Sequence, residues 1–208
     1  MKQIFVVTHA ESVHHVEGRV GGWYDTPLTE TGRRQAGQIA ERLHSLLRKQ
    51  EVELFSSDLL RASQTAEAIG ARFSVTAVLM PALREMSHGV AEGQPQEWLS
   101  RNQVPPSEDD LLDYRGVIKG ETRREVAARI YPALEQIAAR DCETQIIVTH
   151  GFALTFIVAA WIDMPIETLG RVSFPVRSAS ITRLASDPYW RNRAVLSLGD
   201  VTHLTAAG

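Results

Sequence analysis

The chain has 208 residues, of which 44% are hydrophobic and 23% charged, a composition typical of one soluble globular domain. Its net charge of −3 gives no general attraction to nucleic acid or to an anionic membrane, so we expect neither as a partner and any anion site to be local. The single cysteine, Cys142, excludes an intrachain disulfide, and the first residues lack the pattern of a secretory signal. Together these features favour a cytoplasmic protein.

The first half of the chain reads as alternating strands and helices. A β-branched run at 3–8 predicts a strand buried on both faces, and a glycine-rich loop with Gly18, Gly21 and Gly22 follows it. Thr29 is a predicted N-cap for an amphipathic helix that reaches about residue 49. The next predicted elements are a strand at 52–56, a helix at 58–73 and a strand at 75–80.

The second half begins with an irregular stretch, 86–120, which contains several glycines and prolines and which we interpret as a lid or substrate-facing excursion. The remaining predicted elements are helices at 122–140 and 151–162, and strands at 145–149, 171–175, 179–184 and 194–198. Strands that alternate with helices predict an α/β fold, with a mainly parallel central sheet covered by helices on both faces. We expect one domain over residues 1–208.

Two of the predicted strands end in the same way. Val-Val-Thr precedes His9 and Ile-Val-Thr precedes His150, and each histidine is followed by a small residue. Ligands bind at the carboxyl ends of strands in open α/β sheets, so neighbouring strands would bring both imidazoles into one crevice. Either histidine alone is compatible with a purely structural role, but the matched pair favours a site.

Two histidines beside backbone amides suit phosphoryl transfer. One neutral imidazole can attack phosphorus and carry the phosphoryl group, while cationic groups stabilise the oxygen charges. Arg61, in the first turn of the helix at 58–73, is a candidate phosphate ligand. Glu85 is a candidate general acid, and Glu92 is its competitor in a more turn-like setting.

Several of these residues match the motifs of a known family. The segment His9-Ala10-Glu11-Ser12, with the glycines and Leu28-Thr29 that follow it, resembles the opening signature of the histidine phosphatase superfamily, the phosphoglycerate mutase-like proteins. Further segments are similar to its other motifs, in order and over nearly the whole chain: 56–66, Leu83-Arg84-Glu85 with Gly89 and Glu92-Gly93, Val148-Thr149-His150-Gly151, 178–182, and Asp200 with His203-Leu204. The resemblance implies a three-layer phosphoglycerate mutase-like fold.

The resemblance also implies roles. His9 would be the nucleophile that becomes phosphohistidine, Arg61 and His150 would bind the phosphoryl group, Glu85 would donate a proton, and the Gly151 amide would assist. Family members need no metal, so we expect no cofactor. The segment between Glu85 and His150 is short for a mutase, which favours a phosphatase that acts on a small phosphate monoester.

The sequence departs from the family pattern around the nucleophile. Thr8 stands where the family normally has arginine, Ala10 replaces a glycine, and His15 and Arg177 stand where asparagine is frequent. Loss of a charge-assisted hydrogen bond of roughly 1.5–3 kcal/mol would slow catalysis by about 10- to 200-fold. We hypothesise that a nearby cationic group compensates, the candidates being His14, His15, Arg19, Arg84 and His88.

The phosphate and substrate contacts expected on these grounds come from the loops around the two histidines. Besides Arg61 and Gly151, we expect Thr8 beside the phosphate, and around the rest of the substrate Ser12, His15, Gly21, Gly22, Arg84 and His88. Trp23, Tyr24, Trp98 and Tyr114 are either an aromatic wall for an organic group or ordinary core packing. The sequence leaves the substrate and the oligomeric state open.

Two other functions remain possible at this point. One is a catalytically impaired relative that binds a phosphorylated ligand or a partner protein, which Thr8 keeps open. The other is a phosphoglycerate mutase. A metal site is disfavoured, because the histidines lack the local spacing of a helix-borne zinc motif.

Overall fold

Six strands form one sheet in the computed structural model, which describes residues 2–48, 50–107, 109–190 and 192–204. Their spatial order is β3 (Val78–Leu79), β2 (Glu53–Ser56), β4 (Thr144–Thr149), β1 (Gln3–Thr8), β5 (Ile181–Ser186) and β6 (Arg193–Asp200). The pairs from β3 to β1 are parallel, and β5 and β6 each pair antiparallel to their neighbour. The mainly parallel α/β sheet predicted from the sequence is confirmed.

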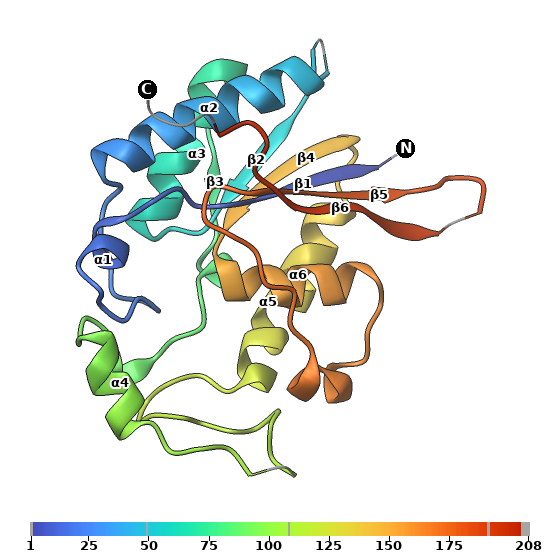
Figure 1. Cartoon of the computed structure of the whole chain (residues 1–208). Helices are drawn as coiled ribbons and strands as arrows, with labels where there is room; N and C mark the ends of the chain where they lie inside the picture. Colours follow the sequence, from blue (N-terminus) through green and yellow to red (C-terminus); the bar gives the residue numbers. More distant parts are fainter. Residues whose placement is uncertain (1, 49, 108, 191, 205–208) are drawn as a thin grey trace.

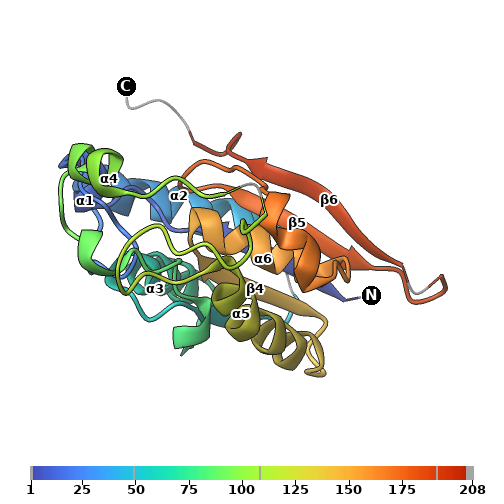
Figure 2. The same cartoon turned by 90° about the horizontal axis from the view of Figure 1, so that it is seen from below.

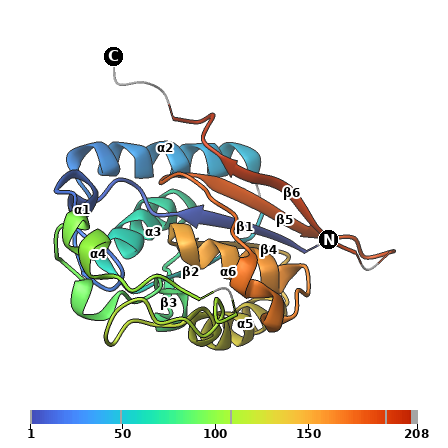
Figure 3. The same cartoon turned by 60° about the horizontal axis from the view of Figure 1, so that its bottom comes forward.

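Helices cover both faces of this sheet (Figures 1 and 3). Helices α2 (Glu30–Leu46) and α3 (Leu60–Phe73) lie over one face, and α5 (Arg123–Ala138) and α6 (Gly151–Trp161) over the other. The β1 side chains alternate between the two cores: Phe5 and Val7 pack with α2 and α3, and Ile4 and Val6 with α5 and α6. Burial on both faces is why this strand is an unbroken apolar run.

Local sequence signals set the limits of the long helices. The Thr29 hydroxyl accepts from the Gly32 amide at 2.9 Å, as its predicted role as an N-cap requires. Thr122 and Glu125 form a reciprocal capping box at the start of α5. Helix α6 is apolar around its whole circumference because nearly all of its side chains are buried.

Some predicted elements are corrected. Residues 172–177 form no strand; the 3₁₀ helix η3 (Ile166–Arg171) precedes them, and the Phe174 amide bonds the Thr155 hydroxyl rather than a strand. Pro175, which has no amide hydrogen, further disfavours a ladder there. The strand expected at 75–80 contracts to Val78–Leu79. Beyond it, the 3₁₀ helix η1 (Pro81–Leu83) leads toward Glu85.

Two loops expected to be irregular contain short helices. The glycine-rich loop after β1 holds α1 (Val13–Val16), and the 86–120 excursion holds the 3₁₀ helix η2 (Gly89–Ala91) and α4 (Gln96–Asn102). The loops meet in an antiparallel bridge between Arg19 and Pro95, so α1 and α4 lie at the same end of the molecule (Figures 1 and 2). That end carries the carboxyl termini of β1 and β4. Within the described ranges, no helix has the length and apolar character needed to cross a membrane.

Candidate active site

The two matched histidines lie side by side at the carboxyl ends of β1 and β4. Thr8 pairs with Thr149 in the parallel ladder, and the His9 amide donates to the Thr149 carbonyl at 2.8 Å. This register holds the two imidazole rings with their centroids 5.0 Å apart in an edge-to-face arrangement. The two strands with the same sequence ending therefore place their histidines next to each other.

The His9 imidazole is held in one tautomer. Its Nδ1 hydrogen donates to the Ala10 carbonyl at 2.7 Å, which leaves Nε2 with its lone pair. The ring is 5% exposed, and burial, followed by the positive charge of Arg61, holds the pKa of His9 well below its usual value. A neutral imidazole whose Nε2 carries a lone pair is the form that can act as a nucleophile.

Arg61, at the start of α3, lies against that nitrogen. Its Nε–H donates to His9 Nε2 at 3.3 Å, and its terminal nitrogens donate to the carbonyls of Tyr24 and Gly22 at 2.9 and 2.6 Å. Gly22 adopts φ +59°, and an added Cβ would lie 2.7 Å from a Glu92 carboxylate oxygen. A glycine is therefore required for the carbonyl that fixes the guanidinium.

His150 adjoins the His9 ring but is fully buried and does not line the cavity that His9 lines. Its Nε2 lies 2.9 Å from the Ser57 hydroxyl, whereas Nδ1 is buried and lacks a hydrogen bond to any part of the chain that the structure describes. Burial and the nearby Arg61 hold the pKa of His150 well below its usual value. An unpartnered buried ring nitrogen costs free energy, which a bound ligand would recover.

The Glu85 carboxylate is placed at the N-terminus of α6. It accepts from the amides of Phe152 and Ala153 at 3.0 and 2.9 Å, and from the amide of Met86 at 2.9 Å. Its own backbone carbonyl accepts from Arg129 on α5 and from the Trp23 indole. The acid is thus fixed from three separate elements.

Its competitor Glu92 has a different environment. One Glu92 oxygen accepts from the Trp23 and His88 amides and from the Ser87 hydroxyl, and the side chain does not line the cavity between the histidines. Glu92 therefore braces the loop, whereas Glu85 faces the cavity.

Two further imidazoles, from α1, complete this cluster. The His15 ring stacks on His9 at 5.3 Å, and the His14 ring lies 4.2 Å from His15. His14 is buried and its pKa is lowered to about 3, mainly by burial; the pKa of His15 is lowered by burial and by Arg61, against the opposing effect of Glu11. Unlike His14, His15 is exposed at the mouth of the site.

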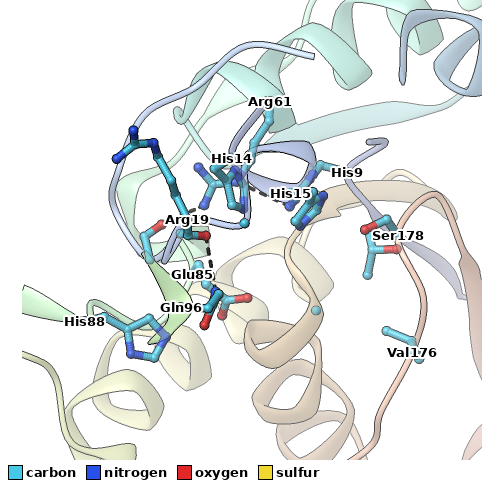
Figure 4. Close-up of a pocket in the computed structure, with 15 residues that line it drawn as sticks. His9, His14, His15, Arg19, Arg61, Glu85, His88, Gln96, Val176 and Ser178 are labelled. Atoms are coloured by element: carbon cyan, nitrogen blue, oxygen red, sulfur yellow. Dashed lines mark hydrogen bonds between the residues drawn. The ribbon is translucent and has the colours of Figure 1, made fainter. Parts of the chain in front are cut away.

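The cavity between these groups has a volume of about 390 Å³ (Figure 4). Its lining includes most residues expected at the site: Thr8, His9, His15, Gly21, Gly22, Arg61, Glu85, His88 and Gly151. His14, Gly18, Arg19, Gln96, Val176 and Ser178 also line it. A volume of this size suits a small ligand.

Three residues expected at the site do not line the cavity: His150, which is fully buried beside His9, Arg84 and Ser12. Arg84 does not line the cavity, because its guanidinium bonds both carboxylate oxygens of Asp58 at 2.7 and 2.5 Å and lies over the Trp23 ring. Ser12 is fully buried behind the imidazoles, with its hydroxyl 3.0 Å from His14 Nδ1. It therefore orients the histidine cluster from behind.

Thr8 is held by the protein itself. Its hydroxyl donates to the Arg177 carbonyl at 2.8 Å and accepts from the Ser180 amide at 3.0 Å. The residue brings no charge to the cavity wall that it lines.

Sequence reasoning missed the two residues that support the pocket from outside, Ser57 and Arg129. Arg129 donates to the carbonyls of residues 82, 84 and 85, and is paired with Glu121 at 2.8 Å. A signal for it existed: it lies three residues after Val126 and four before Ala133, on the buried face of α5. In the described part of the chain, no group of three or more histidine, cysteine or acidic side chains is arranged to hold a metal ion.

Comparison with known proteins identifies several relatives. The family model described as "Histidine phosphatase superfamily (branch 1)" matches residues 4–196. Proteins called "Probable phosphoglycerate mutase GpmB" are similar over nearly the full chain: that of Proteus mirabilis (strain HI4320) is 33% identical, covering 99% of this chain and 96% of the relative, and that of Yersinia pestis (strain Pestoides F) is 30% identical, covering 98% and 95%.

Solved structures are similar as well. The structure titled Bacillus stearothermophilus YhfR has a TM-score of 0.79 at 26% identity, covering 98% of this chain and 99% of that one. A mycobacterial glucosyl-3-phosphoglycerate phosphatase in complex with VO3 has a TM-score of 0.78 at 25% identity, covering 96% and 98%. The three-layer fold predicted from the sequence agrees with these neighbours.

Proposed function

The chain belongs to the histidine phosphatase superfamily, and we propose that it is a metal-independent phosphatase that hydrolyses a small phosphate monoester through a phosphohistidine on His9. The observation that carries the proposal is the state of His9: a neutral ring, fixed through Nδ1, with Nε2 directed to Arg61 in a cavity that Glu85 also lines. The similar proteins include a phosphatase and probable mutases, all of which transfer phosphoryl groups.

In the proposed first step, His9 Nε2 attacks phosphorus and the bond from phosphorus to the ester oxygen breaks. Glu85, protonated at this stage, gives its proton to the leaving oxygen and becomes a carboxylate. In the second step, the carboxylate takes a proton from a water molecule whose oxygen attacks the phosphohistidine. Inorganic phosphate leaves, and neutral His9 and protonated Glu85 are restored.

The remaining groups stabilise charge on the phosphoryl oxygens. The Arg61 Nε–H, now 3.3 Å from His9 Nε2, would turn to an oxygen once Nε2 bonds phosphorus. The unpartnered His150 Nδ1 would gain a hydrogen bond. Gly151 is the first residue of α6, where a backbone amide points out of the helix toward an anion.

A mutase is the second candidate, favoured by the names of the curated relatives. A mutase must return the phosphoryl group to substrate before water reaches it. The exposed position of His15, Gly18 and Arg19 around the cavity leaves its mouth open to water, which supports hydrolysis over retention.

The experiment is phosphate release from p-nitrophenyl phosphate in the presence of a chelator, comparing the native protein with His9→Ala. His44→Ala, on α2 against Phe73 and outside the cavity lining, is the matched control. We expect phosphate release and an acid-labile phosphoryl label with the native protein and the control, and neither with His9→Ala.

A parallel assay for interconversion of 2- and 3-phosphoglycerate separates the two enzymes. Interconversion faster than phosphate release would replace the phosphatase by a mutase. Binding of inorganic phosphate without turnover of any ester would instead indicate the catalytically impaired relative.

A further inference from the structure

A second cavity, of about 460 Å³, lies beside the phosphate pocket. His88 lines both cavities, and in Figure 4 it lies on the opposite side of the pocket from Ser178. Met86 and Phe152 connect the two cavities in a second way. Their backbone amides donate hydrogen bonds to the carboxylate of Glu85, the proposed acid, and both residues line the second cavity. The second cavity therefore begins directly behind the group that would protonate the leaving oxygen.

The wall of the second cavity is apolar in its chemistry. Met86, Leu99, Leu111, Val117 and Phe152 contribute aliphatic or aromatic side chains. Such a lining favours a hydrophobic occupant, because each apolar group that leaves water there lowers the free energy of the complex.

Three of the polar side chains of the wall, those of Tyr114, Glu121 and Arg123, are already engaged by the protein. The Tyr114 hydroxyl donates to the Val104 carbonyl, and Glu121 is paired with Arg129. The Arg123 guanidinium donates to the carbonyls of Leu169 and Val172, both at 2.8 Å, and lies over the Phe152 ring at 5.0 Å. The charged side chains of the wall are therefore occupied, which leaves the apolar side chains as its main contact surface.

The wall is fastened to the phosphate pocket. Gly89 adopts φ +50°, and an added Cβ would lie 2.3 Å from the Ile118 carbonyl oxygen, so the backbones of η2 and of residues 118–120 are in close contact. The Val90 amide donates to the Ile118 carbonyl at 3.1 Å, and the Glu121 amide to the Ser87 carbonyl at 2.9 Å. Residues 86–90 and 117–121 thus form one connected wall that includes His88.

We infer that the second cavity binds the organic part of the substrate, and that this part is an apolar group of about the size of a fused aromatic ring system. The inference rests on the proposed function, because it takes the leaving oxygen to lie beside Glu85. Attack in line from His9 directs the leaving group away from that histidine. The path beyond Glu85 and His88 leads into the second cavity.

The test measures binding and turnover separately. Calorimetry compares 2-naphthylmethylphosphonate with methylphosphonate, which share the anionic group and cannot be hydrolysed. The native protein is compared with Val117→Trp, which fills the second cavity, and with Ile118→Trp, a matched change at a neighbouring side chain that is 72% exposed and does not line it. Turnover is followed with 2-naphthyl phosphate and glycerol phosphate.

We expect the naphthyl phosphonate to bind at least ~10-fold more tightly than methylphosphonate to the native protein and to Ile118→Trp, since a buried ring system removes a large apolar area from water. Val117→Trp should lose most of that ratio and keep its affinity for methylphosphonate, which also reports that it is folded. If Val117→Trp does not fold, Leu99→Trp on α4 fills the same cavity.

Equal affinities for the two phosphonates, or a ratio that survives both cavity-filling changes, would overturn the inference. A ratio that behaves as expected in a protein that hydrolyses neither ester would support the second cavity and reject the proposed phosphatase.

Discussion

Replacement of His15 by asparagine tests whether this imidazole supplies the positive charge that Thr8 does not. The His15 ring stacks on the proposed nucleophile at 5.3 Å, whereas the Thr8 hydroxyl is bonded to Arg177 and Ser180. A charge-assisted hydrogen bond to a phosphoryl oxygen contributes roughly 1.5–3 kcal/mol, which corresponds to about 10- to 200-fold in kcat/KM.

The pH at which this contribution appears follows from the environment of His15. The charged groups that act on it are Arg61, which disfavours the cationic ring, and Glu11, which favours it, and the rings of His9 and His14 lie against it. Burial and Arg61 lower the pKa of His15 from 6.5, so His15 is protonated in the free protein only at acidic pH. The contribution is therefore present below the lowered pKa and lost as the pH rises through it.

The assay is kcat/KM for p-nitrophenyl phosphate between about pH 4.5 and 8.5, for the native protein and His15→Asn, because kcat/KM reports ionisations of the free enzyme. The ratio of the two proteins cancels ionisation of the substrate itself. We expect a ratio of about 10 to 200 in acid that approaches one near pH 8. The reasoning is refuted by a ratio that stays constant with pH, or by one that grows in alkali; His44→Asn, outside the pocket, should give a ratio of one throughout.

Three further predictions concern the acid, the buried His14 and Thr8. Glu85→Gln should lower kcat for alkyl phosphates by about 10²- to 10⁴-fold and for p-nitrophenyl phosphate by much less, since a good leaving group needs no proton; equal losses would argue against Glu85 as the acid. Because the pKa of His14 falls from 6.5 to about 3 on folding, its contribution to stability is complete above 6.5 and is lost as the pH falls toward 3. Urea unfolding should therefore show native stability falling by about 2 kcal/mol more than that of His14→Gln between about pH 8 and 5, and parallel curves would contradict this pKa. Thr8→Val should lower the free energy of unfolding by about 1–3 kcal/mol, because it leaves the Ser180 amide unpaired, while kcat/KM changes less than about threefold; the reverse pattern would give the Thr8 hydroxyl a role in binding phosphate.

The sheet and the paired histidines were predictable because their signals are local and repeated. The apolar runs of β1 and β4 identify strands buried on both faces, and parallel neighbours end at the same edge. His9 and His150 follow those strands directly, so their meeting needed no knowledge of the loops. The helix caps at Thr29 and Thr122 are equally local.

The roles of the arginines were not predictable in this way. Arg61 was expected in the pocket and lines it, whereas Arg84, in another segment that follows a strand, was expected there and does not. The difference depends on loop geometry: Asp58 lies where it binds Arg84, while the Gly22 and Tyr24 carbonyls lie where they fix Arg61. Arg129 was missed because its partners are backbone carbonyls of a distant segment, which carry no side-chain signature.

The substitutions at positions 8 and 15 are physically connected. Arg61 lowers the pKa of His9, His14, His15 and His150, so every fixed positive charge in this pocket makes an imidazolium harder to form. A second guanidinium at position 8 would lower the pKa of His15 further and favour the neutral ring. With threonine there, protonation of His15 is opposed by one fewer cation, and a bound phosphate dianion would favour it. If His15 supplies the charge that Thr8 does not, a double-mutant cycle of Thr8→Arg with His15→Asn should show coupling between the two positions.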